Sequence, residues 1–234
     1  MGRIRAILLL GVWLLPATGL KNWTLRRLGH AVHSSATAKA NLVWRVRVFD
    51  VGPGSRVDRG NVFKNLRLVR VGDGATIGRW NTFSTHPAFA RLLPTGAQLT
   101  LATRSYITSR HQVDCSGSLH VGELAAVAGH QTKILTHSID LARNAQSARP
   151  VVIGARTFVG ARCLLLGGAE MPERSVLAAG SVLTPRPEPR ESGLWAGVPA
   201  VYKRPIEGAW FDRAERGTPD IYIPDTGESV QGAI

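Results

Sequence analysis

Hydrophobic residues recur along much of this chain with a period of six. An aliphatic residue, often followed by glycine, returns at every sixth position. The longest unbroken run consists of Ile153, Val159, Leu165, Met171, Leu177 and Leu183. Shorter runs with the same spacing consist of Val51, Val57 and Phe63; of Val71, Ile77 and Phe83; of Ile107, Val113 and Leu119; and of Val121 and Val127. A short repeat of this kind indicates a solenoid of stacked units.

The period predicts a parallel β-helix of triangular cross-section, in which each hexad forms one flat face and its aliphatic residue points into the interior. Three hexads make a coil, and stacked coils bury a continuous core. A glycine such as Gly72 fits the corners, where a side chain would crowd the turn or a positive φ is required. The phase slips from Leu119 to Val121 and from Phe83 to Ile107 predict extruded loops. The alternative, a β-sandwich with irregular alternation, is disfavoured by six unbroken hexads.

The amino terminus carries an apolar run, residues 6–15. The run is flanked on both sides by basic residues, namely Arg3, Arg5, Lys21, Arg26 and Arg27. It is shorter than the roughly 20 residues of a spanning helix. We rank an interfacial anchor first, because arginine and lysine can meet anionic lipid, then a secretory signal peptide, and then a plain core helix. We therefore assign residues 1–45 to a basic, apolar N-terminal segment that contacts the membrane interface.

Composition places the chain among folded globular proteins, since 44% of its 234 residues are hydrophobic and 19% are charged. The two cysteines exclude a disulfide framework and a Cys-rich zinc site. The net charge of +13 favours a polyanionic partner, such as nucleic acid, an anionic membrane or a phosphorylated ligand. No basic-aromatic motif, zinc finger or basic heptad is present, so we expect no nucleic-acid partner.

The stretch from Pro150 to Ala200 resembles the terminal coils of the hexapeptide-repeat acyltransferase superfamily, and most of all its sugar and maltose O-acetyltransferase branch. The matching segments are Ile153-Gly154-Ala155-Arg156-Thr157-Phe158-Val159-Gly160-Ala161, Leu177-Ala178-Ala179-Gly180-Ser181-Val182-Leu183-Thr184 and Ala196-Gly197-Val198-Pro199-Ala200. The resemblance implies an all-β fold, a left-handed parallel β-helix. We expect it to occupy residues 46–186 and a Pro-rich C-terminal tail, residues 187–234, to wrap over the solenoid or a neighbouring subunit.

Acyl transfer to an alcohol or amine needs a general base near the acceptor proton and donors for the developing oxyanion. In the resembled enzymes the base lies just before an extruded loop, upstream of the final hexads. His137 occupies that place, and Asp140 or Asp114 could orient its imidazole. His130 is the second candidate for the base. His111 is a candidate for a structural or acceptor-binding role.

The resemblance also implies that acetyl-coenzyme A is the acyl donor and lies in a groove between adjacent subunits of a homotrimer, with no metal required. Small residues would offer backbone groups to its pantetheine arm. By family position the expected coenzyme contacts are Ala161, Ala179, Gly180, Ser181 and Thr184. The family often continues Thr-Lys-Asp after this point, whereas this chain reads Thr184-Pro185-Arg186. We therefore expect Arg186 or Arg204 to supply the charge near the nucleotide phosphates.

Together these features predict an acetyl-CoA-dependent acyltransferase, and more narrowly an O-acetyltransferase acting on a sugar or a cell-surface polysaccharide precursor. Because acetyl-CoA is a cytoplasmic donor, we expect a cytoplasmic protein at the inner face of the membrane. Two alternatives stay open. One is a zinc-dependent hydratase resembling the carbonic anhydrase of this fold, whose metal takes histidines from adjacent subunits. The other is a non-catalytic β-helix that binds or scaffolds.

Overall fold

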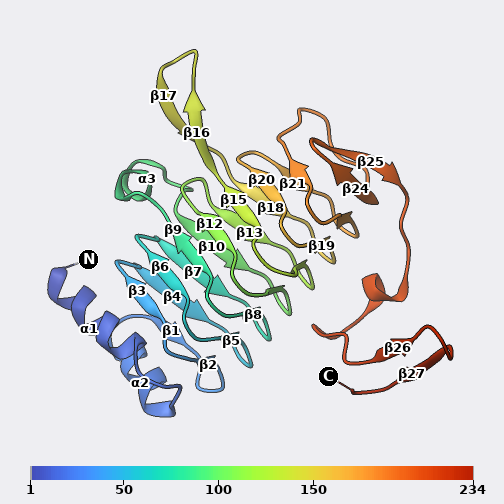
Figure 1. The fold of residues 1–234 in the computed structure, drawn as a ribbon. Coiled ribbons are helices and arrows are strands. Elements are labelled where there is room, and N and C mark those ends of the chain that lie inside the picture. Colours follow the sequence, from blue (N-terminus) through green and yellow to red (C-terminus); the bar gives the residue numbers. More distant parts are fainter. Residues whose placement is uncertain (1, 234) are drawn as a thin grey trace.

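The chain forms a β-helix with three parallel faces, as a computed structural model of residues 2–233 shows (Figure 1). The first face contains β1 (Ala31–Val32), β4 (Val48–Val51), β7 (Leu68–Val71), β10 (Gln98–Leu101), β13 (Leu119–Val121), β18 (Val151–Ile153) and β21 (Glu170–Met171). The second contains β2 (Thr37–Ala38), β5 (Arg56–Val57), β8 (Thr76–Ile77), β11 (Tyr106–Ile107), β14 (Ala126–Val127), β19 (Phe158–Val159), β22 (Val176–Leu177) and β24 (Leu194–Gly197), and β25 (Ala200–Arg204) is added to β24 in the antiparallel direction. The third contains β3 (Leu42–Trp44), β6 (Val62–Lys64), β9 (Thr82–Ser84), β12 (Gln112–Asp114), β15 (Lys133–Leu135), β20 (Leu164–Leu166) and β23 (Val182–Leu183). The predicted β-helix is therefore confirmed.

The six-residue period marks the interior, as the sequence predicts. Each hydrophobic residue of the runs given above has at most 3% of its surface exposed. The rings of Phe63 and Phe83 stack between successive coils with 5.1 Å between their centroids, and Phe49 meets Phe63 edge-on within one coil at 4.9 Å. This core is a single column, because each side chain contacts the residues one coil above and one coil below.

Glycine is required at the corners by close packing of successive coils. A Cβ added to Gly78 would lie 2.4 Å from the carbonyl oxygen of Thr108, and one added to Gly154 would lie 2.5 Å from the backbone nitrogen of Glu173. Neither distance is compatible with a side chain. The backbone of the next coil thus excludes any larger residue at these positions.

The short phase slip has a different origin from the one predicted. Leu119 and Val121 are both buried on β13, and Val69 and Val71 repeat this arrangement on β7. The first face is one residue pair longer in these coils, so no loop is extruded at Leu119. The longer slips do produce extrusions from the third face. These are residues 85–97, with α3 (Pro87–Leu92), and the antiparallel hairpin of β16 (His137–Asp140) and β17 (Ala145–Ala148).

The N-terminal helices close one end of the β-helix. These are α1 (Arg3–Trp13) and α2 (Gly19–Arg27). Trp13 is fully buried, with its ring centroid 4.5 Å from that of Phe49. Buried Lys21 donates hydrogen bonds from Nζ to the carbonyl oxygens of Trp13, Leu15 and Lys39, which join the end of α1 to the first coil. Burial lowers the pKa of Lys21 to about 8.

Only one face of the N-terminal segment contacts the core. The opposite face exposes large apolar side chains, namely Ile4, Ile7, Leu8, Leu14, Leu15, Leu20 and Trp23. No helix within residues 2–233 has the length and apolar character needed to cross a bilayer. The repeat also extends beyond the expected residues 46–186, because β1 pairs with β4 at one end and β22 pairs with β24 at the other.

The C-terminal tail turns back along the outside of the β-helix (Figure 1). It contains the 3-10 helix η1 (Ala209–Asp212) and a hairpin of β26 (Ile221–Ile223) and β27 (Glu228–Val230). Arg156 donates hydrogen bonds to the carbonyl oxygens of Phe211 and Arg213, and Arg216 bonds that of Gly74, far back along the solenoid. Trp210 packs edge-on against Phe158 with 5.6 Å between centroids. The tail is thus fastened to several coils.

Candidate active site

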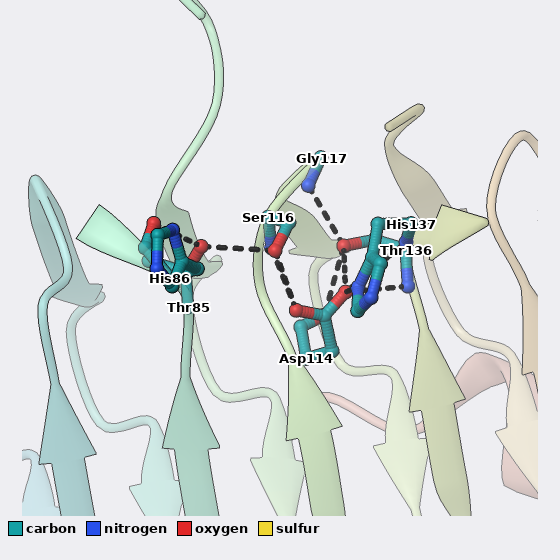
Figure 2. A network of polar contacts seen from close by, with 7 residues as sticks. All are labelled: Thr85, His86, Asp114, Ser116, Gly117, Thr136 and His137. Carbon is teal, nitrogen blue, oxygen red and sulfur yellow. Dashed lines mark hydrogen bonds and ion pairs between the residues drawn. The ribbon is translucent and has the colours of Figure 1, made fainter. Parts of the chain in front are cut away.

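His137 lies where the third face ends and the hairpin begins. Residues of the loops that follow β9, β12 and β15 meet at this corner, because these strands are neighbours in one parallel sheet (Figure 2). Asp114, the last residue of β12, is opposite Leu135 of β15 in the register. Stacking therefore brings Asp114 to the start of the segment that carries His137.

The imidazole of His137 is held by Asp114. Its Nδ1 lies 2.8 Å from the Oδ2 of Asp114, and its backbone nitrogen donates to the same oxygen at 3.1 Å. A carboxylate only accepts, so Nδ1 carries the proton and Nε2 presents a lone pair. Within residues 2–233, Nε2 makes no hydrogen bond, and 41% of the side chain is exposed. This tautomer suits a general base facing a substrate.

Asp114 is itself fixed by hydrogen-bond donors on two sides. Ser116 donates from Oγ to Oδ1 at 2.6 Å, and the backbone nitrogen of Thr136 donates to Oδ2 at 3.0 Å. The hydroxyl of Thr85 lies 2.9 Å from that of Ser116 and extends the network to the next coil (Figure 2). Burial by itself would raise the pKa of Asp114, but hydrogen bonds from Ser116, His137 and Thr136 outweigh it and lower that pKa. Asp114 thus stays ionised beside the imidazole.

A cavity of about 560 Å³ opens in front of this pair, and we call it the His137 cavity. The loop with α3 and the hairpin both contribute to its walls, with Phe89 from α3 and Gln146 from β17. The rings of Phe89 and His137 are 5.5 Å apart between centroids. His86 begins α3, where its Nδ1 accepts a hydrogen bond from the backbone nitrogen of Ala88. Both extrusions therefore shape the space that His137 faces.

Asp140 does not join His137, contrary to one of the two expectations for the orienting carboxylate. It pairs with Arg143, whose Nη1 lies 2.7 Å from Oδ2. It also lines a separate hollow of about 240 Å³ together with Ser138 and Ser147. Alternate residues of a strand point to opposite sides, so on β16 Asp140 faces away from His137. Arg143 lowers the pKa of Asp140 through hydrogen bonds from its side chain and its backbone.

His130 lies outside the His137 cavity as well, at an exposed corner after β14. His111 is a structural residue. Its Nδ1 accepts a hydrogen bond from the backbone nitrogen of Thr132, and its Nε2 lies 2.9 Å from the hydroxyl of Thr108. It extends a buried ladder in which side-chain amides bond from coil to coil. The ladder consists of Asn41, Asn61 and Asn81.

The expected coenzyme residues lie on the last coils. Ala161 and Gly180 occupy stacked corners, where the nitrogen of Gly180 donates to the carbonyl oxygen of Ala161 at 2.9 Å. Ala179 is exposed beside them, and a Cβ on Gly180 would meet open space. These small residues leave room for a pantetheine chain along the corner. Ser181 is buried, however, and its hydroxyl accepts a hydrogen bond from the nitrogen of Gly197.

The residues expected to bind the phosphates differ in the contacts that their side chains already make. The guanidinium of Arg186 lies over the ring of Trp195, 5.3 Å from its centroid, and Arg190 lies over the same ring. Thr184 is half-buried, and its carbonyl oxygen accepts a hydrogen bond from Arg190. Arg204 is exposed, and its side chain bonds only the carbonyl oxygen of Pro205 within residues 2–233. Arg186 and Arg204 therefore both lie at the surface near the end of the β-helix.

Neither cysteine has the setting of a nucleophile. Cys115 is fully buried, and burial, followed by the charge of Asp114, raises the pKa of its thiol well above the ordinary value. Burial also raises the pKa of Cys163. A thiol rather than a thiolate is present at both positions. Within residues 2–233, no three His, Cys, Asp or Glu side chains gather closely enough to hold a metal ion.

Comparison with known proteins agrees with this architecture. Residues 150–185 match the family described as the hexapeptide repeat of succinyl-transferase. A search of curated proteins finds no significant relative. The matched residues lie in the last coils of the three-sided β-helix.

Several solved structures are similar to this chain. One is a serine-to-alanine mutant of AntD, an N-acyltransferase from Bacillus cereus, in complex with dTDP-4-amino-4,6-dideoxyglucose and coenzyme A. It is 13% identical over 69% of this chain and 86% of that chain, with a TM-score of 0.53. A serine-to-threonine mutant of AntD with dTDP and coenzyme A is 12% identical over 69% and 85%, with a TM-score of 0.54. A hexapeptide-repeat-containing acetyltransferase from Vibrio cholerae is 17% identical over 88% and 91%, with a TM-score of 0.44.

Proposed function

We propose that this protein is an acetyl-CoA-dependent acyltransferase in which His137 is the general base. The observation that carries the proposal is the contact between His137 and ionised Asp114 at the wall of a cavity. A half-buried carboxylate on Nδ1 fixes the tautomer in which Nε2 is the acceptor and stabilises the imidazolium that forms when Nε2 takes a proton. The repeat match over residues 150–185 and the coenzyme A bound by AntD support the choice of donor.

The reaction proceeds by direct transfer. Nε2 of His137 removes the proton of the acceptor hydroxyl, and the oxygen attacks the thioester carbonyl. When the tetrahedral intermediate collapses, the C–S bond breaks and the imidazolium returns its proton to the departing sulfur. A backbone N–H at the corner holds the oxyanion. Coenzyme A lies along Ala161, Ala179 and Gly180, which fits the open space beside these small residues.

The acceptor in this proposal is a sugar, and the atom acylated is a hydroxyl oxygen, as in the sugar O-acetyltransferase branch. AntD was solved with an amino sugar bound to dTDP, which supports a sugar acceptor. A panel of sugars paired with their amino-sugar counterparts, assayed by mass spectrometry, distinguishes O-acylation from N-acylation. Acetylation of the amino sugar alone would contradict the hydroxyl assignment.

We further propose a homotrimer at the inner face of the membrane. The exposed apolar side chains of α1 and α2 support membrane contact, since they could enter the headgroup region while neighbouring basic groups meet anionic lipid. Co-sedimentation with phosphatidylglycerol vesicles tests this directly. Replacing Ile4 and Leu8 with glutamine should abolish sedimentation, whereas Leu141→Gln, on the distant hairpin, should not. Light scattering tests the trimer.

The decisive experiment is acetyl-CoA turnover by His137→Ala. We expect thiol release to fall by about 10²–10⁴-fold, the usual contribution of a general base. His130→Ala is the matched control, because this histidine lies outside the cavity, and it should keep full turnover. Equal activity of His137→Ala and wild type would overturn the proposal. Zinc content measured on the same samples would identify the hydratase alternative.

A further inference from the structure

A second cavity, of about 660 Å³, lies against the His137 cavity and is lined by arginines. We call it the arginine pocket. Its basic residues come from α1, from the β3–β4 connection, from the β6–β7 connection and from α3. They are Arg3, Arg45, Arg47, Arg67 and Arg91. Figure 1 shows the start of α1 beside β3, and α3 further along the same edge of the β-helix next to β9.

The positive charge of the arginine pocket is not balanced by acidic side chains within residues 2–233. No acidic residue lines it, and none of its five arginines forms an ion pair within residues 2–233. Elsewhere arginines do find carboxylates, as Arg70 finds Asp50 and Arg174 finds Asp212. Five like charges around one hollow repel one another, so an anion bound among them would be strongly attracted.

Two of the arginines are held in place. Arg67 donates from Nη2 to the carbonyl oxygens of Ala90 and Leu93 and from Nη1 to that of Pro94, at the end of α3. The guanidinium of Arg45 lies over the ring of Trp44, 5.6 Å from its centroid. Arg67 therefore contributes fixed positive charge to the pocket. The guanidinium of Arg45 donates no side-chain hydrogen bond within residues 2–233, so its planar fork can match two oxygens of a phosphate.

The arginine pocket and the His137 cavity share a wall. Buried Asn65 lines both, and the consecutive α3 residues Phe89 and Ala90 face the His137 cavity and the arginine pocket respectively. A single extended molecule could therefore lie in both cavities, with an anionic end among the arginines and a hydroxyl near His137.

We propose that the arginine pocket binds the phosphate groups of the acceptor, and that the acceptor is a sugar carried on a diphosphate. This inference rests on the proposed function only for the end of the acceptor that is acetylated, namely the hydroxyl near His137. Several arginines match the charge of a diphosphate better than that of a single carboxylate, and bidentate contacts would fix the distance from the phosphates to the hydroxyl.

The test measures binding of inorganic pyrophosphate to the full chain by calorimetry, without acetyl-CoA. The variant Arg47→Gln/Arg91→Gln removes two exposed arginines that make no side-chain hydrogen bond within residues 2–233. We expect at least tenfold weaker binding. The control Arg56→Gln/Arg59→Gln removes the same charge from exposed positions outside the pocket and should bind like wild type. Equal losses in both variants, or no binding to wild type, would overturn the proposal.

Further arms identify the source of the phosphates. Tighter binding of dTDP than of pyrophosphate supports a nucleotide-linked sugar, and tighter binding of farnesyl diphosphate supports a lipid-linked one. Displacement of pyrophosphate by acetyl-CoA would overturn the proposal, because the pocket would then serve the donor. Loss of vesicle binding in Arg47→Gln/Arg91→Gln without any pyrophosphate binding would assign the arginines to a membrane instead. His137→Ala should bind pyrophosphate normally, so that failure of the proposed function and failure of this inference are distinguishable.

Discussion

His137 and Asp114 are 23 residues apart in the chain, yet the imidazole Nδ1 and the carboxylate Oδ2 are 2.8 Å apart. The distance results from the stacking of β12 on β15, which places the end of one coil beside the end of the next. The two side chains need no conformational change to meet, because the hydrogen bonds between stacked strands fix the backbone on which each stands. The catalytic consequences can be tested residue by residue.

Asp114→Asn should lower kcat by about 10²–10⁴-fold with little change in the KM for acetyl-CoA, because an amide cannot stabilise an imidazolium and can favour the wrong tautomer. The control is Asp140→Asn, which changes the same functional group on the side of β16 that faces away from His137. It should leave kcat within about twofold, since its partner is an exposed arginine. Steady-state thiol release measures both. A larger loss in Asp140→Asn than in Asp114→Asn would contradict the assigned pair.

Ser116→Ala should move the acid-induced loss of stability to higher pH. The folded protein lowers the pKa of Asp114 below its ordinary value of 3.8, so the stabilising contribution of the carboxylate is present above that value and is lost as pH falls through the folded pKa. Removing the Ser116 hydroxyl raises the folded pKa, and the loss begins at a higher pH. Urea unfolding at a series of acidic pH values measures the shift. Ser105→Ala, which removes a buried hydroxyl at another corner, should leave the profile unchanged.

Stability should fall between about pH 6.5 and pH 4 because two buried histidines are neutral in the folded state. Burial lowers the pKa of His30 and of His111 to about 4. The unfolded chain binds these protons near pH 6.5, so stability is complete above that value and declines as pH drops. Each shift corresponds to about 3 kcal/mol at full protonation. Urea unfolding at pH 7 and pH 5 measures the decline.

His111→Asn provides a specific check on that explanation. Asparagine at this position would continue the ladder formed by Asn41, Asn61 and Asn81 and would not titrate. The variant should fold and should lose less stability between pH 7 and pH 5 than wild type does. An unchanged pH dependence would mean that His111 is not one of the groups responsible.

Trp13→Ala should destabilise the protein by about 3–5 kcal/mol, because it leaves a cavity between α1 and the first coils. Trp23→Ala is the matched control, since 49% of that tryptophan is exposed on α2. It should change stability by less than about 1 kcal/mol while weakening binding to anionic vesicles. Chemical denaturation and vesicle co-sedimentation measure the two effects. Equal destabilisation by the two variants would contradict the capping role of α1.

The six-residue period determined the fold of this protein from sequence alone, because burial inside a three-sided solenoid demands a small set of residues at a fixed spacing. It also marked His137, which stands where the period is interrupted by the hairpin. The choice between Asp114 and Asp140 needed the tertiary structure, since it depends on which coil stacks on which and on the direction of alternate side chains along β16.

The arginine pocket and the N-terminal segment likewise divide into what local spacing predicts and what the stacking of coils decides. The arginines of the pocket are spread from Arg3 to Arg91 and show no common spacing, so only the closing of one end by α1 and the extrusion of α3 bring them together. The apolar N-terminal run predicted a surface that is more stable when it is buried away from water. Packing decided which half covers the core, with Leu9 and Trp13 buried, and which half remains outside, with Ile4 and Leu8 exposed. Local periodicity encodes burial, whereas contacts between loops are set by the stacking of whole coils.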